Sequence, residues 1–84
     1  MEHHMAITAK STIDDIVSHR RKLGLNQSDF WRPVGITQSG ASRYESGRAI
    51  PRSVRTLLAI TYGTDAGAQK VVADLRKQAA PQRG

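Results

Sequence analysis

The apolar residues in the first third of this chain recur at helical spacing. Ser11 and Thr12 are good N-cap residues, and two aspartates follow them, where the helix dipole favours negative charge. Gly24 stands where helices commonly end in the left-handed conformation. These signals predict a helix over residues 13–23, with an apolar stripe of Ile13, Ile16, Val17 and Leu23.

Four more helices are predicted by the same combination of caps and stripes. The second should be distorted at its end, because Pro33 has no amide hydrogen and disfavours the α conformation at the residue before it. Pro51 suits the first turn of the fourth. The N-caps are Asn26, Thr37 and either Thr64 or Asp65, and the glycines at turns or helix ends are Gly35, Gly47 and Gly63. The predicted helices cover 27–32, 38–46, 51–62 and a last stretch that begins near residue 65 and includes Ala79.

These elements predict one compact all-α domain, a five-helix bundle, because no strand-like alternation, repeat or linker interrupts them. Residues 1–10 show no periodicity and are expected to be disordered, with 1–4 resembling vector-derived sequence ahead of a native start at Met5. The folded domain is expected over 11–80, with a frayed tail at 81–84. The stripes of the last two helices are Val54, Leu57, Leu58 and Thr61, then Ala68, Val71, Val72, Leu75 and Ala79.

The composition excludes several classes of function. The absence of Cys removes disulfides, a thiolate nucleophile and cysteine-based metal sites. No apolar run approaches a membrane span, so the chain is expected to be cytoplasmic. A net charge of +6 on 84 residues favours a polyanionic partner, with nucleic acid ahead of membrane headgroups. The alternative is a solubilising charge without a partner.

The informative block is residues 27–45, which reads as a helix, a glycine turn and a second helix. Its inward positions are apolar, whereas the second helix leaves hydrogen-bonding side chains and one cation outside, with no carboxylate among them. Glu45 points back toward the first helix by its helical phase. The inward positions are Phe30, Val34, Ile36, Ala41 and Tyr44, and the outward ones are Gln38, Ser39, Ser42 and Arg43.

This block resembles the phage repressor and Cro-type (XRE-like) helix-turn-helix domain, also called lambda-repressor-like. The resemblance covers roughly 13–62, and the fifth helix matches only in length and placement. It rests on three segments in register without a gap, Leu23-Gly24-Leu25-Asn26-Gln27, Gly35-Ile36-Thr37-Gln38-Ser39-Gly40 and Glu45-Ser46-Gly47.

The resemblance implies a role for each matching position. The helix that begins at Gln38 is expected to read the major groove of duplex DNA, with Gln38 suited to adenine and Arg43 to guanine. Arg20 and Glu45 match a structural pair that ties the first helix to the third. The base-contacting set is Gln38, Ser39, Ser42 and Arg43, and the phosphate-contacting set is Asn26, Gln27, Thr37, Ser46, Gly47, Arg48 and Arg52.

Two positions depart from the family pattern. Trp31 stands where the family usually has a small residue, and we interpret it as filling space left by the small Gly40 and Ala41 opposite. Pro33 puts the end of the second helix in doubt. His19 is expected to pack in the core, and Arg55 either contacts DNA or lies on a solvated helix face.

These observations predict a sequence-specific DNA-binding transcriptional regulator, a repressor of bacterial or phage type. A homodimer is expected, because one recognition helix reads only a few base pairs. Val71, Val72 and Leu75 are the candidate dimer surface, and the alternative is that this stripe packs in the domain's own core. The alternative is an antitoxin-type or accessory module whose main partner is another protein, such as a toxin. No enzyme, cofactor or metal site is expected, because catalytic clusters and phosphate-cradling glycine loops are missing and the adjacent His3 and His4 belong to the vector-like start.

Overall fold

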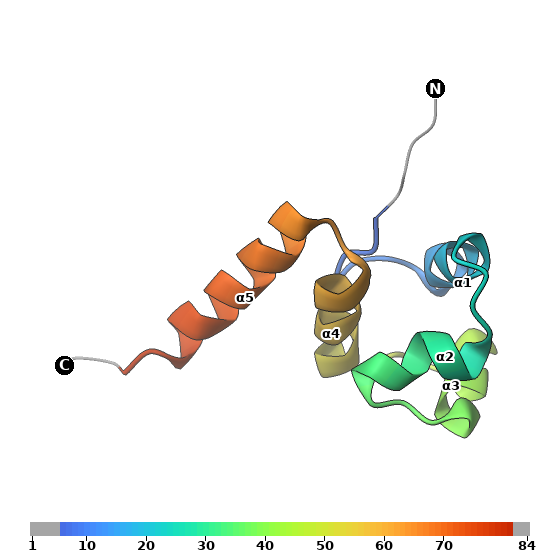
Figure 1. Cartoon of the computed structure of the whole chain (residues 1–84). Coiled ribbons are helices and arrows are strands. Elements are labelled where there is room, and N and C mark those ends of the chain that lie inside the picture. Colours follow the sequence, from blue (N-terminus) through green and yellow to red (C-terminus); the bar gives the residue numbers. More distant parts are fainter. Residues whose placement is uncertain (1–5, 82–84) are drawn as a thin grey trace.

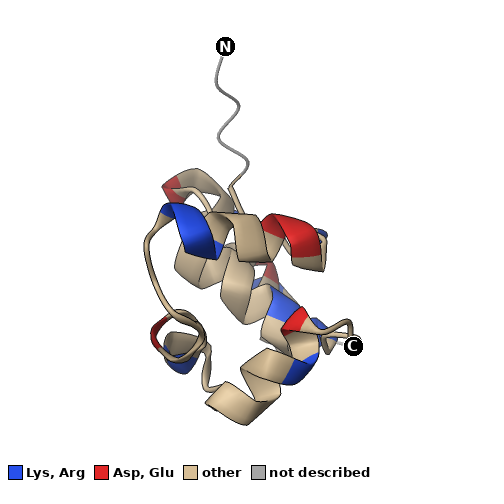
Figure 2. Cartoon of the chain, turned by 90° about the vertical axis from the view of Figure 1, so that its right-hand side faces the viewer, with Lys and Arg blue, Asp and Glu red and all other residues tan. Residues whose placement is uncertain are grey.

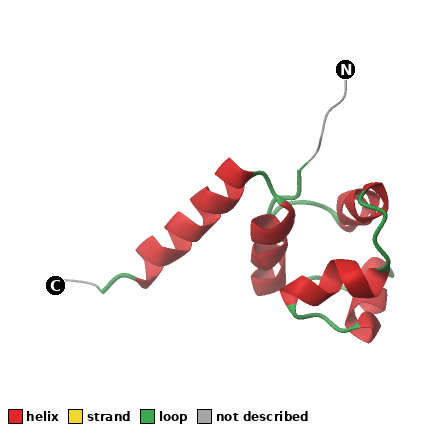
Figure 3. Cartoon of the chain, viewed as in Figure 1, coloured by secondary structure: helices red, strands yellow, loops and turns green. Residues whose placement is uncertain are grey.

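Five α-helices and one short 3-10 helix account for most of residues 6–81, the part that the computed structural model describes. Figure 3 shows helices and loops there and no strand. The predicted all-α fold is therefore confirmed. The helices are α1 (Ile13–Lys22), α2 (Gln27–Trp31), α3 (Gln38–Glu45), α4 (Arg52–Tyr62) and α5 (Asp65–Ala79), and the 3-10 helix η1 (Arg32–Val34) follows α2 directly.

The helix starts agree with the predicted caps. Thr12 forms a capping box with Asp15, in which each side chain accepts a hydrogen bond from the other residue's backbone amide. Side-chain oxygens of Asn26, Thr37 and Thr64 each accept from the backbone amide three residues on. The fourth helix begins one residue later than predicted, because Pro51 has an extended ψ of 151° and so lies outside α4.

The region around Pro33 behaves as its chemistry requires. The α-helix stops at Trp31, and the chain continues as the 3-10 helix η1, with Pro33 inside it. Gly35 then turns the chain with a φ of 80°, a value that side chains other than glycine rarely adopt. The predicted distortion at the end of the second helix is confirmed.

One hydrophobic core lies among α1, α2, η1, α3 and α4. Trp31 and Phe30 are fully buried in it, and the Phe30 ring stacks on Tyr62 of α4 with centroids 4.2 Å apart. The Tyr62 hydroxyl donates a hydrogen bond to the Phe30 carbonyl, which joins α4 to α2. The buried members of the core are Ile7, Ile16, Phe30, Trp31, Val34, Ala41, Ile50, Val54 and Leu58.

The N-terminal segment is ordered where the structure describes it, so the prediction of disorder is wrong for residues 6–10. Ile7 is only 3% exposed and belongs to the core. Gly63 permits this, because a side chain there would collide with the carbonyl oxygens of Ile7 and Ala59. Its φ is −80°, so Gly63 is not the left-handed helix end that the sequence suggested. Residues 1–5 and 82–84, with the predicted vector-like start and frayed tail, lie outside the described part.

α5 differs from the other helices. Figure 1 shows it extending from the end of α4 away from α1, α2 and α3. None of its residues is buried; Ala68, Val71 and Val72 are half-buried near α4, and Leu75 and Ala79 are exposed. In α4, the buried face consists of Val54, Leu58 and Ala59, whereas Leu57 and Thr61, which were expected inside, are exposed.

Candidate nucleic-acid interface

The outer face of α3 carries the four side chains that the sequence assigned to base contact. Ala41 is fully buried beneath the helix, and Tyr44 packs against the core on the same side. Helical phase then places the opposite face in solvent. Gln38, Ser39, Ser42 and Arg43 are all exposed, as the pattern predicted.

These side chains surround a hollow together with Gln27, which reaches it from α2. The hollow has a volume of about 410 Å³ and is lined by two amides, two hydroxyls and one guanidinium. No carboxylate lines it. Amide and guanidinium groups are the side chains that pair with adenine and guanine edges in the major groove. The surface is therefore chemically suited to a nucleic acid.

The only carboxylate of α3, Glu45, is turned away from this face and buried. Arg20 of α1 donates two parallel hydrogen bonds to it, from Nε and from Nη2, both at 2.8 Å. The exposed fraction of the side chain is 13% for Arg20 and 8% for Glu45. A third bond from the Arg20 guanidinium goes to the Leu25 carbonyl at 3.0 Å. The expected pair between the first and third helices is thus present and bidentate.

Two more donors complete the site around Glu45. The Trp31 indole Nε1 donates to Oε2 at 2.8 Å, and the Gln27 Nε2 donates to Oε1 at 3.1 Å. Burial alone would raise the pKa of Glu45, but the hydrogen bonds from Arg20, Trp31 and Gln27 outweigh it and hold the pKa below the ordinary value. Glu45 therefore stays ionised and joins α1, α2 and α3 through one carboxylate.

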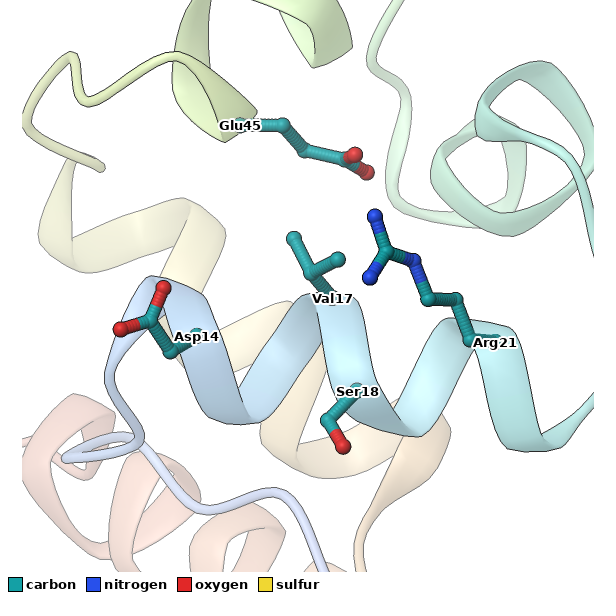
Figure 4. A pocket seen from close by; sticks show the side chains of 5 residues that line it. All are labelled: Asp14, Val17, Ser18, Arg21 and Glu45. Carbon is teal, nitrogen blue, oxygen red and sulfur yellow. The ribbon is translucent and has the colours of Figure 1, made fainter.

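A second open hollow lies beside Glu45 on α1. Figure 4 shows the Glu45 carboxylate pointing from the end of α3 toward α1, with the Arg21 guanidinium pointing toward it. Asp14, Val17 and Ser18 complete the lining. The carboxylate of Asp14 and the ionised Glu45 make this hollow less suited to a polyanion than the face of α3.

Sequence reasoning missed the polar role of Trp31. Its side chain is fully buried as expected, but its indole N–H also donates a hydrogen bond to Glu45 on another helix. The expectation that Trp31 fills the space left by Gly40 is wrong: a Cβ at Gly40 would meet the side chains of Ile36 and Thr37, and not the indole. Ala41 shares the buried core with Trp31.

The predicted phosphate contacts are distributed over three places. Asn26 and Thr37 cap α2 and α3 and are exposed, whereas Gln27 is half-buried by its bond to Glu45. Arg52 is exposed in the first turn of α4.

The loop after α3 has few free backbone donors. The backbone amides of Ser46, Gly47 and Arg48 all donate to carbonyls at the end of α3, so Arg48's exposed side chain is the main donor that this loop offers.

Arg55 and His19 have structural contacts. Arg55 donates to the Ser11 carbonyl at 2.8 Å and to the Ile50 carbonyl at 3.3 Å, so neither of its two predicted roles describes it. It joins α4 to the segment that carries Ile7. His19 is half-buried and meets the Tyr62 ring edge-on, with centroids 6.0 Å apart. Burial, with a smaller effect of Lys22, lowers the pKa of His19.

The basic residues are spread over several helices, as the blue bands of Figure 2 show. Between residues 6 and 81, no helix is long and apolar enough to cross a membrane, and no group of His, Asp or Glu is arranged to hold a metal ion. Val71, Val72 and Leu75 lie on α5, which Figure 1 shows apart from α3.

Comparison with known proteins gave one match. A family model described as RsaL-like HTH domain covers residues 17–61, more than half of the chain. No curated protein and no solved structure matches. The match supports the helix-turn-helix class and, with it, a DNA-binding regulator. The more specific assignment to the phage repressor and Cro type stays a prediction.

Proposed function

The chain belongs to the RsaL-like HTH domain family, and from this premise we propose that it is a transcriptional repressor of bacterial or phage type. It binds duplex DNA in a sequence-specific way and inserts the outer face of α3 into the major groove. The cytoplasm, where such DNA lies, is its site of action. Repression follows when the bound protein occupies the DNA that a transcription complex needs.

The observation that carries this proposal is the separation of charge on α3. Gln38, Ser39, Ser42 and Arg43 are exposed around one hollow, whereas Glu45 is withdrawn into a bidentate pair with Arg20. A carboxylate on the outer face would repel the phosphate backbone. The four remaining side chains offer donors and acceptors that base edges can meet.

The roles of individual residues follow from their chemistry. Gln38, in the first turn of α3, pairs with adenine through its amide, and Arg43, one to two turns later, pairs with the O6 and N7 of guanine. Ser39 and Ser42 contact adjacent base edges. The phosphate contacts come from Asn26, Gln27, Thr37, Arg48 and Arg52 of the predicted set, because the amides of Ser46 and Gly47 and the Ser46 hydroxyl already donate to carbonyls of α3.

We propose that two copies bind one palindromic operator. A single α3 reads only a few base pairs, and two half-sites about one helical turn apart, roughly 34 Å, supply the rest of the specificity. α5 is the element that remains for a second copy, because its apolar stripe is half-buried at Val71 and Val72 and exposed at Leu75. The same exposed stripe favours the second candidate, an antitoxin-type module in which α5 binds a different protein.

Selection of bound sequences from random duplex DNA tests the proposal, followed by affinity measurements for two matched arginine variants. Arg43→Ala should weaken the selected sequence by roughly 1–3 kcal/mol and relax preference at one base pair. Arg52→Ala should weaken all sequences alike and lower the salt slope by about one. Selection that enriches no sequence contradicts the proposal. Copurification of a second polypeptide with the native protein would favour the protein-binding alternative.

A further inference from the structure

A third hollow lies at the turn between α2 and α3, and no predicted base contact except Gln38 borders it. It has a volume of about 380 Å³. Gln38 lines both this hollow and the one at the outer face of α3, so the two lie on adjacent sides of the same side chain. The lining consists of Ser28, Arg32, Gly35, Ile36, Thr37 and Gln38.

Four side chains around this hollow carry hydrogen-bond donors, those of Ser28, Arg32, Thr37 and Gln38. The Arg32 side chain is 74% exposed, and within residues 6–81 its guanidinium makes one hydrogen bond, from Nη2 to Asp29 at 2.9 Å. A guanidinium has five N–H donors, so four are left for a ligand. Thr37 accepts a hydrogen bond from the Gly40 amide, and its hydroxyl hydrogen remains able to donate. No carboxylate lines the hollow, and the Asp29 carboxylate is paired with the Arg32 guanidinium.

The position of Arg32 is fixed by its neighbours. Trp31 and Val34 are buried, and Pro33 lies between Arg32 and Val34 in the 3-10 helix. Because Trp31 and Val34 must both face the core, Arg32 is turned outward, beside the start of α3. The change from α to 3-10 helix at Pro33 thus places a cation next to the recognition face.

We infer that this hollow binds a phosphodiester group of the DNA backbone and that Arg32 is its cation. The inference rests on the proposed function, since it needs α3 to lie in the major groove. The phosphate bound here flanks the base pair that Gln38 reads. Arg32 keeps its pair with Asp29, which offsets the charge of that carboxylate, and binds the phosphate through its remaining N–H donors.

The test is the salt dependence of binding to the selected duplex and to an unrelated duplex, measured by fluorescence anisotropy on the full chain. Arg32→Ala should weaken binding to both duplexes by the same factor and lower the slope of log K against log salt by about 0.9, the value for one lost phosphate contact. Arg32→Lys keeps the charge and should keep the slope. The matched control is Lys77→Ala, which removes an exposed cation from α5 and should leave the slope unchanged.

The outcomes separate this inference from the proposed function. An unchanged slope for Arg32→Ala, beside a wild-type chain that prefers one sequence, overturns the inference and leaves the proposed function standing. A changed base preference with an unchanged slope also overturns it, because Arg32 is then a base reader. A wild-type chain that binds every duplex equally contradicts the proposed function, while the loss of slope in Arg32→Ala still supports the phosphate contact. A wild-type chain that binds no DNA overturns both.

Discussion

In residues 6–81, every buried side chain belongs to α1–α4, to the loops between them or to the segment before α1, whereas α5 contributes none. The first region holds a continuous core and a carboxylate with four hydrogen bonds from three donor residues. α5 adjoins α4 at its first turns and then extends away from the bundle (Figure 1). The buried core that stabilises the domain therefore lies outside α5, and α5 keeps an apolar stripe for the association proposed above.

The two regions also differ in what determines their structure. α5 carries its own local signals, with Thr64 as N-cap, Asp65 in the first turn and cations in the last turn. Such signals stabilise a helix without fixing where it packs. In α1–α4, by contrast, the packing is fixed by the shared hydrophobic core and by polar contacts between helices, above all those of Glu45.

The largest loss of stability is expected for Trp31→Ala. This change removes the largest buried side chain and one hydrogen bond to Glu45, so the free energy of unfolding should fall by about 3–5 kcal/mol. Denaturant unfolding, followed by circular dichroism, measures it. The matched variant Trp31→Phe keeps most of the volume but removes the N–H donor, and a smaller loss, about 1–3 kcal/mol, is expected. Equal losses in the two variants would mean that the hydrogen bond, and not the volume, matters.

Much of the fold could be predicted from the sequence because its signals are local. The caps at Thr12, Asn26, Thr37 and Thr64 act over three residues, and the distortion at Pro33 follows from the chemistry of one ring. Ile7 could not be predicted, because a single apolar residue in a segment without periodicity carries no pattern. Its burial depends on distant groups, a glycine at position 63 and the bond from Arg55 to Ser11.

Arg20→Ala should be the second most destabilising change. It leaves Glu45 buried and ionised with only Trp31 and Gln27 as donors, and it also removes a hydrogen bond to the Leu25 carbonyl. Removing one partner of a buried ion pair costs about 3–5 kcal/mol. The double variant Arg20→Met with Glu45→Gln serves as control, since it removes both charges, keeps an oxygen acceptor for the Trp31 indole N–H and should recover much of the loss. Melting temperatures of the three proteins measure it, and an Arg20→Ala variant as stable as the parent would contradict the structural role of the pair.

The site was predicted less completely than the fold. The outward positions of α3 follow from helical phase and are exposed as expected. The sequence predicted only some of the hydrogen-bond partners of Glu45. The pair with Arg20 came from the family resemblance, but the bonds from Trp31 and Gln27 join different helices and depend on how α2 crosses α3. The phosphate contact that we infer for Arg32 could not be read from the sequence, because an arginine before a proline resembles any solvated loop cation.

A smaller effect is expected on the pH dependence of the unfolding free energy, through Glu45 and His19 of the bundle. The pKa of Glu45 is lowered, so the stability it contributes is complete above 4.5, its ordinary value, and is lost as the pH falls through the lower folded pKa. The pKa of His19 is also lowered, so its contribution is complete above 6.5 and is lost as the pH falls below that value. Unfolding free energies measured between pH 7 and pH 3 should therefore fall in two stages. His19→Leu should abolish the first stage only, and a parent protein whose stability is constant over this range would contradict both assignments.

The smallest effect on stability is expected in α5. Leu75 is 42% exposed and touches no buried cluster, so Leu75→Gln should change the unfolding free energy of the monomer by less than about 0.5 kcal/mol. The measurement needs a concentration at which the chain is monomeric, because a dimer stabilises its folded subunits by mass action. At higher concentrations, sedimentation should show a weaker dimer for this variant, and affinity should fall for a two-half-site duplex but not for a single half-site. Leu23→Gln is the matched control: its side chain is 48% exposed at the end of α1, on the other side of the bundle from α5 (Figure 1), and it should leave association unchanged. A large loss of monomer stability for Leu75→Gln would mean that Leu75, like Val71 and Val72, takes part in the packing of α5 on α4, and an unchanged dimer would assign association to another surface.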